Sequence, residues 1–85
     1  MPLDLNQVRL EALSDIRYSF WTGKHPSHSY ERSVLVIRFE GTYRFGSGGN
    51  PDATFMRSMG EAAVKAFAPD ALIIDLSALS YYLGQ

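Results

Sequence analysis

Two apolar runs on either side of one helical segment restrict the fold more than any other feature of this sequence. The first, Val34 to Ile37, lies in a strand predicted near 33–45, and four successive apolar residues are typical of a strand buried on both faces. A second buried strand is predicted at 71–76, and a helix near 51–67 lies between the two. Strand, helix and strand within about 45 residues predict a βαβ unit with parallel strands and a right-handed crossover. We therefore expect an α/β fold, with a small sheet and the helix on one face.

The helical segment has recognisable start, face and stop signals. Asn50 is predicted as the N-cap, Pro51 as the first helical residue, and Asp52 as a carboxylate that complements the positive end of the helix dipole. Gly60 in the interior predicts a close approach to a neighbouring backbone, and residues 68–70 end the helix. Two adjacent apolar rows are expected to face the sheet: Phe55, Met59, Ala62 and Ala66, with Met56, Ala63 and Phe67 beside them.

The first part of the chain gives a weaker pattern. A strand is predicted near 16–21, where Ile16, Tyr18 and Phe20 alternate with polar residues. The segment 1–16 before it fits both a helical stripe and a strand alternation, so the choice between helix and strand stays open. Residues 22–33, which contain glycine, proline and several serines, predict a loop.

The chain has 85 residues and no cysteine, which limits its sources of stability. We expect a single domain, 1–85, whose core is marginal unless other contacts support it. Disulfides and thiolate metal sites are excluded. One face of the predicted sheet also needs a cover that the single helix does not supply, so the N-terminal segment, a partner, or both would have to cover it. These points predict association with a second copy, as a homodimer, or with another protein.

The charge balance excludes one class of partner. Eight lysines and arginines against nine acidic residues give a net charge of −1, without the positive field that non-specific nucleic-acid binding requires. Arginines alternate with aromatic residues at 17–21 and 43–45, but their order does not match the RNA-recognition consensus. No apolar run reaches the roughly 18 residues of a membrane span, and residues 1–10 lack the apolar centre of a signal peptide. We expect no nucleic-acid partner, no membrane association and a cytoplasmic location.

No set of catalytic or metal-binding residues stands out in the sequence. His25, His28 and Glu31 are close enough along the chain to ligate zinc together, but a structural site needs four ligands and a catalytic site needs three and an open position. Ser27 lies in the same segment as both histidines, so nucleophile and base do not come from converging elements. The sequence therefore favours a non-catalytic protein without a cofactor or metal.

A glycine-rich stretch before the helix offers an alternative function. Residues Ser47, Gly48, Gly49 and Asn50 lead into the helix N-terminus, where backbone N–H groups are able to hold an anion. No Walker lysine follows, so a turn chosen for its glycines is the favoured interpretation. The alternative is a small-ligand or nucleotide-binding domain that uses the Gly46–Asn50 loop together with Asp75, which lies towards the end of the strand predicted at 71–76.

The order of these segments resembles the STAS domain. The match covers Val34 to Tyr81 and rests on the strand at 34–41, the helix, and the run from Ala71 that continues as Asp-Leu-Ser-Ala-Leu-Ser-Tyr. STAS domains form anti-sigma factor antagonists and the cytoplasmic tails of sulfate transporters. The resemblance implies an α/β module that acts in regulation by binding other proteins.

Two departures from the STAS pattern change what is expected. In the antagonists the final strand leads into a turn whose hydroxyl residue is phosphorylated, but Leu83, Gly84 and Gln85 stand at that place, and Ser77 and Ser80 lie too early. No phosphorylation site is therefore carried over. STAS domains also continue through further helices and a strand, so we expect a truncated or divergent relative, or a second copy that supplies the absent layer.

Together these features predict a non-catalytic, STAS-like interaction module that forms a homodimer or binds a partner protein. Pairing through a sheet edge is the expected mode. The interface candidates are the large apolar and aromatic residues of the first predicted strand and of the C-terminal residues, namely Phe20, Trp21, Tyr81, Tyr82 and Leu83.

Overall fold

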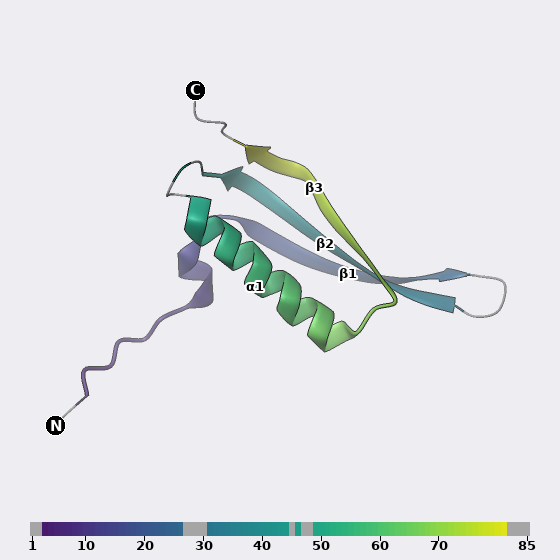
Figure 1. The fold of residues 1–85 in the computed structure, drawn as a ribbon, viewed down its shortest axis with the longest axis horizontal. Helices are drawn as coiled ribbons and strands as arrows, with labels where there is room; N and C mark the ends of the chain where they lie inside the picture. The colour runs from purple at the N-terminus through teal and green to yellow at the C-terminus, as the bar shows by residue number, and fades with distance from the viewer. Residues whose placement is uncertain (1–2, 27–30, 45, 47–48, 82–85) are drawn as a thin grey trace.

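A computed structural model describes residues 3–26, 31–44, 46 and 49–81 (Figure 1). The described chain contains one α-helix, one short 3-10 helix and three strands. In chain order these are η1 (Leu10–Leu13), β1 (Arg17–Pro26), β2 (Glu31–Tyr43), α1 (Gly49–Phe67) and β3 (Ala71–Tyr81).

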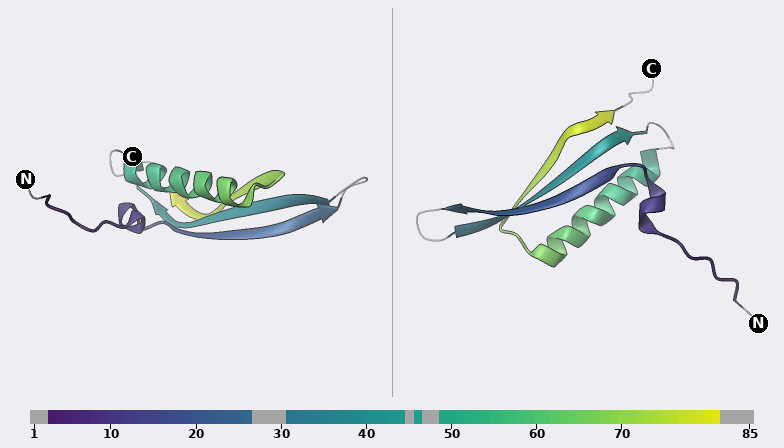
Figure 2. Two further views of the ribbon diagram at one scale, coloured as in Figure 1. Left: turned by 90° about the horizontal axis from the view of Figure 1, so that it is seen from below. Right: turned by 180° about the vertical axis from the view of Figure 1, so that it is seen from behind.

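The three strands form one mixed sheet in the order β1-β2-β3. Strands β1 and β2 are antiparallel, with Arg17 opposite Glu40, whereas β2 and β3 are parallel, with Val34 opposite Ala71. The helix α1 follows β2 and precedes β3 in the chain, and it lies on one face of the sheet (Figure 2). The mixed α/β class predicted from the sequence is thus confirmed.

The core lies between α1 and β2. Side chains of β2 at every second position, Leu35, Ile37 and Phe39, are buried on the face that meets Phe55 and Ala63 of α1. The molecule is only 14 Å thick across its shortest axis, as expected for one sheet and one helix. Among the described residues, no second layer covers the opposite face of the sheet (Figure 2).

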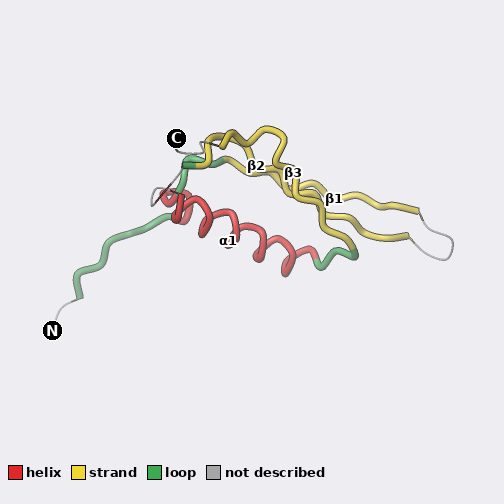
Figure 3. The backbone as a smooth tube through the Cα atoms, turned by 45° about the horizontal axis from the view of Figure 1, so that its top comes forward, coloured by secondary structure: helices red, strands yellow, loops and turns green. Residues whose placement is uncertain are grey.

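The prediction of a loop at 22–33 is wrong for most of these residues. Residues 22–26 continue β1 and residues 31–33 begin β2, with Thr22 opposite Leu35 and Pro26 opposite Glu31; residues 27–30 lie outside the described chain. This hairpin extends past the end of α1 (Figure 3). Its outer residues are mostly exposed, so they carry no apolar alternation, and their strand conformation comes from cross-strand pairing.

The N-terminal segment is neither of the two structures predicted for 1–16. Residues 3–9 have no regular secondary structure, and only Leu10–Leu13 form the 3-10 turn η1, which packs against α1. This segment therefore leaves the far face of the sheet uncovered.

The helix α1 differs from its prediction at the start and along its buried row. It begins at Gly49, so Asn50 and Pro51 already lie in the first turn and Asn50 is not the N-cap. The buried row contains Phe55 and Ala63 with the half-buried Met59, whereas Ala62 and Ala66 are exposed. A Cβ atom at Gly60 would meet Ile37 Cδ1 at 3.9 Å, an ordinary contact, so Gly60 is not the predicted close approach. That approach occurs at Gly49, where a Cβ atom would collide with the carbonyl oxygen of Arg44.

The end of α1 and the start of β3 are close to the prediction. The helix ends at Phe67. The next residue, Ala68, has a positive φ of 44°, and its backbone N–H donates to the Val64 carbonyl oxygen at 2.8 Å. This is a left-handed helix ending. Asp70 then joins the start of β3 to β2, because its carboxylate accepts hydrogen bonds from the backbone N–H and hydroxyl of Ser33 at 2.8 and 3.2 Å.

Strand β3 is longer and more exposed than predicted. It continues past residue 76 to Tyr81 through a bulge, since Arg38 is opposite Asp75 but Glu40 is opposite Ala78. The sequence predicts a buried strand, yet Leu72, Ile73 and Ile74 are 43%, 53% and 52% exposed. The reason is position: β3 is an edge strand, and α1 packs against β2 and η1 rather than over β3.

Candidate interaction surface

An apolar groove lies beside α1 on the helix-covered face of the sheet. Its volume is about 420 Å³, and β2 and β3 form its floor while α1 forms one wall. Alternation along the strands places Leu72 and Ile74 of β3 on this face, opposite Leu35 and Ile37 of β2. The apolar lining of this β3 groove consists of Ile37, Phe39, Met56, Val64, Leu72 and Ile74.

The groove follows from the dimensions of the two layers. An α-helix with its side chains is about 10 Å wide and neighbouring strands are about 4.8 Å apart, so one helix covers about two strands. Here α1 packs against β2, and the strip over the first half of β3 lacks a full cover among the described residues, whereas Leu79 in the second half is buried in the core. Gly60 has no side chain to extend the helix wall over this strip.

Charged residues of α1 form the rim of the β3 groove. Arg57 Nε lies 3.4 Å from Glu61 Oε1, and both side chains are largely exposed. Lys65, one turn further along, is also exposed and lines the groove. The two cations and one anion leave the rim with one net positive charge. An apolar floor within a charged rim is the usual composition of a protein-binding surface.

The opposite face of the sheet also carries an apolar row, beside a second hollow of about 450 Å³ that Val34, Ala71 and Ile73 help to line. Trp21, Val36 and Ile73 lie side by side across the three strands. Trp21 is 61% exposed, and its indole N–H donates to Ser19 Oγ at 3.0 Å. Towards the start of β1 the same face is charged, and Arg17 Nη2 lies 3.4 Å from Glu40 Oε2.

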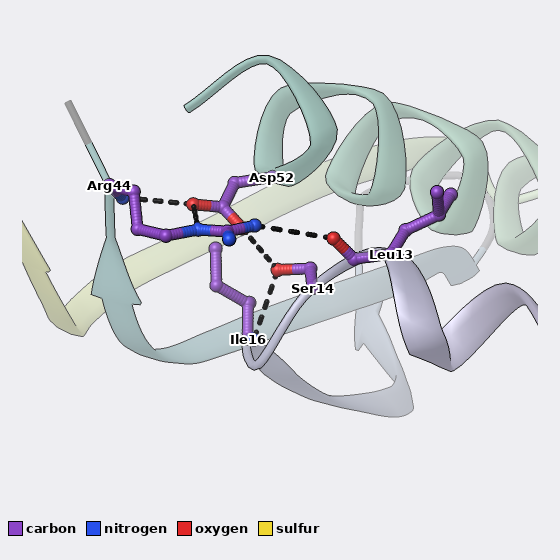
Figure 4. Close-up of polar contacts among 5 residues, drawn as sticks. All are labelled: Leu13, Ser14, Ile16, Arg44 and Asp52. Atoms are coloured by element: carbon purple, nitrogen blue, oxygen red, sulfur yellow. Dashed lines mark hydrogen bonds and ion pairs between the residues drawn. The ribbon is translucent and has the colours of Figure 1, made fainter. Parts of the chain in front are cut away.

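The most densely bonded polar group of the described chain is Asp52, in the first turn of α1 (Figure 4). Its Oδ2 accepts hydrogen bonds from the backbone N–H and Nε of Arg44 at 2.9 and 3.0 Å. Its Oδ1 accepts from Arg44 Nη2 at 2.8 Å and from the Ser14 hydroxyl at 2.6 Å. Arg44 Nη2 also donates to the Leu13 carbonyl oxygen at 3.3 Å. This cluster of Ser14, Arg44 and Asp52 ties η1, the end of β2 and α1 together.

The electrostatics of this cluster indicate a structural role. Hydrogen bonds from Arg44, which outweigh the cost of burial, hold the pKa of Asp52 well below its usual range, and the Ser14 hydroxyl lowers it further. The same hydrogen bond to Asp52 raises the pKa of Arg44. Asp52 is only 1% exposed and both carboxylate oxygens are fully engaged. Asp52 therefore serves to join the three segments around it.

The predicted ligand residues lie far apart in the structure. Gly49 and Asn50 are at the start of α1, close to the ionised Asp52, whereas Ser47 and Gly48 lie outside the described residues. Asp75 is opposite Arg38, about five residues or 16 Å along β2 from its end, and on the face away from α1. Its Oδ1 accepts from the backbone N–H and hydroxyl of Ser77 at 2.9 and 2.6 Å, which lowers its pKa. The structure thus gives Asp75 a place in the β3 bulge.

The predicted interface residues are also divided. Phe20 faces α1, with its ring centroid 6.3 Å from that of Phe67, whereas its neighbour Trp21 points to the opposite face. Tyr81 ends β3 opposite Tyr43. Tyr82 and Leu83 lie outside the described residues.

The histidine segment is placed in part. His25 is exposed at the end of β1, opposite Arg32, and Glu31 Oε2 lies 3.8 Å from Lys24 Nζ. His28 lies outside the described residues. Within the described ranges, no group of three metal-ligating side chains comes together, and no helix combines the length and apolar character that crossing a membrane requires.

The sequence predictions missed the β3 groove and the Asp52 cluster. A signal for the groove was present, because the unbroken apolar run at 71–74 needs cover on both faces and only one helix is available. The sequence gives no sign that Asp52 pairs with Arg44, since an acidic residue in the first turn of a helix is equally well explained by its interaction with the helix dipole. Comparisons of the chain with models of protein families, with curated proteins and with solved structures find no match.

Proposed function

We propose that this protein is a non-catalytic interaction module that binds a second copy of itself or a partner protein through the β3 groove. The observation that carries this proposal is the exposure of Leu72 and Ile74, at 43% and 52%, on the floor of an apolar groove. Contiguous apolar surface with a charged rim on a small protein is typical of a protein-binding site.

The edge position of β3 supports the same proposal. Within the described sheet β3 pairs only with β2, so its outer edge presents backbone N–H and C=O groups to a partner. Natural proteins protect such edges with charged residues, bulges or a covering element. The bulge after Asp75 affects only the second half of β3, and residues 71–74 are apolar. The first half of β3 is therefore the part best suited to a partner.

A relation to STAS domains and a regulatory role in the cytoplasm belong to this proposal. The parallel pairing of β2 and β3 around α1, within the region that resembles STAS, supports the relation. The proposal includes a right-handed crossover from β2 through α1 to β3, which is the usual hand of a βαβ unit. The absence of cysteine is compatible with the cytoplasm.

Two substitutions on neighbouring residues of β3 test the proposal. Ile74 and Ile73 are equally exposed, at 52% and 53%, but Ile74 faces the groove and Ile73 the opposite face. We expect the wild-type chain to associate in sedimentation velocity experiments across the micromolar range. Ile74→Asp should weaken association at least about tenfold, because it places a charge in an apolar contact, whereas Ile73→Asp should retain it.

A wild-type chain that stays a folded monomer throughout this range, and that captures no partner protein through the groove, would refute the proposal. Equal loss of association in both variants would instead assign the contact to the backbone edge of β3 alone, and loss only in Ile73→Asp would assign it to the opposite face. Circular dichroism spectra of the three chains provide the control for folding.

A further inference from the structure

We infer that the β3 groove binds the N-terminal arm, residues Leu3–Arg9, of a second copy of this chain. This inference rests on the proposed function and names the occupant of the groove. The arm is a further apolar surface of the molecule that lacks cover: Leu3, Leu5 and Val8 are 80%, 84% and 85% exposed. Each molecule thus carries both an apolar groove and an apolar arm.

The position of the arm favours another copy over its own chain. Ser14 and Leu13 are held to Arg44 and Asp52 at the N-terminal end of α1. In Figures 1 and 2, the arm leaves this point on the side of α1 away from β3 and runs outwards from the molecule. To reach its own groove, the arm would have to reverse direction and cross α1. Reaching the groove of a neighbouring molecule requires no such reversal.

The arm and the groove have similar lengths. The groove wall runs along α1 from Met56 to Lys65, which is about 14 Å at the rise of an α-helix. An extended segment from Leu3 to Val8 spans about 17 Å. The arm therefore extends over the whole length of the groove, with Leu3 and Leu5, which share one face of an extended segment, over the floor formed by Leu72 and Ile74.

The charges of the two surfaces are complementary. Within the arm, Asp4 is negative and Arg9 is positive, but Arg9 lies at the inner end and its Nε is 3.7 Å from Glu11 Oε2, so residues 3–8 carry one negative charge. The rim of the groove has one net positive charge, because Glu61 already pairs with Arg57 and Lys65 adds a second cation. An arm in the groove brings Asp4 to the rim while its apolar residues leave water. Such a contact is exposed at the rim, so it contributes more to orientation than to affinity.

A mixing experiment between two variants tests the inference. Leu5→Asp removes the apolar arm and leaves the groove intact, whereas Ile74→Asp blocks the groove and leaves the arm intact. Both positions are exposed in the single chain, so both variants are expected to fold. Each variant alone should associate at least about tenfold more weakly than wild type. When the two are mixed, carrying different fluorophores, association between unlike chains should return, because one arm and one groove remain.

The outcomes separate this inference from the proposed function. Recovery in the mixture supports arm binding between copies. If Leu5→Asp alone associates as wild type does while Ile74→Asp does not, the inference is overturned and the proposed function stands. A mixture without recovery overturns it too, since groove-to-groove pairing or an arm bound in its own groove gives that result. A monomeric wild-type chain overturns the arm inference directly. Leu3→Asp and Leu72→Asp replace either variant that fails to fold.

Discussion

The first turn of α1 and the β3 groove lie on the same face of the sheet, and they differ in how their side chains are used. Around Asp52 every polar atom of the carboxylate has a partner, and the residue is 1% exposed. In the groove, Leu72 and Ile74 of β3 are about half exposed and have no cover within the described chain.

This difference separates residues that hold the chain together from residues left for a partner. The cluster of Ser14, Arg44 and Asp52 joins three segments that are distant in sequence, so its contribution is to the fold of the single chain. The groove adds little to that fold because its floor is partly in water. Substitutions at the two places should therefore affect different measurements.

The largest effect on stability is expected for Asp52→Ala. It removes four hydrogen bonds and leaves the Arg44 guanidinium and Ser14 hydroxyl without their shared partner. We expect a loss of about 3 kcal/mol in the free energy of unfolding, at the low end for a buried ion pair because Arg44 stays partly in water. Urea denaturation measures this loss. Asp75→Ala is the matched control, since this carboxylate bonds to Ser77 two residues away and its removal should change the free energy of unfolding much less.

Acid should lower the free energy of unfolding through the same residue, Asp52. The folded pKa of Asp52 lies below the unfolded value of 3.8, so its contribution is present above that value and is lost as the pH falls below it. Denaturation curves recorded from neutral to acidic pH should show this loss in the wild-type chain and a flatter profile in Asp52→Asn. Identical profiles would show that Asp52 is not held in its ionised form by the fold.

Two glycines of α1 give opposite expectations for the same substitution. Gly49→Ala would place a Cβ atom against the backbone of Arg44, which forces the helix start apart, and should cost about 1 to 3 kcal/mol. Gly60→Ala makes only an ordinary contact with Ile37 and should stabilise the helix by up to about 1 kcal/mol. Thermal unfolding of both variants measures the difference. A larger loss at Gly60 than at Gly49 would contradict the assigned packing of α1.

The smallest effect is expected from anions. The ionised Asp52 in the first turn of α1 opposes a second negative charge there, so phosphate and nucleotides should leave the unfolding temperature unchanged at millimolar concentration. A bound ligand at 100 times its dissociation constant would add about 2.7 kcal/mol, which a thermal-shift assay detects easily. A clear shift would favour the alternative of a ligand-binding domain that uses the Gly46–Asn50 loop.

The fold could be predicted to the extent that its signals were local. The strand near 33–45 and the helix near 51–67 follow from apolar periodicity, and both are found close to those bounds. The ends of β1 and β2 were missed because cross-strand pairing, which one segment alone does not encode, extends them. The exposure of Ile74 was missed for a related reason: an apolar run shows that a residue needs cover, but not whether the cover comes from its own chain.

Hydrogen–deuterium exchange at low and high micromolar concentration tests the central claim most directly, because it reports on each segment separately. We predict that amides in residues 71–76 of β3 and in the arm 3–9 gain protection as the concentration rises, while those around Asp52 in residues 49–55 stay unchanged. Unchanged exchange in 71–76, or protection gained only around Trp21 in residues 17–26, would contradict the account.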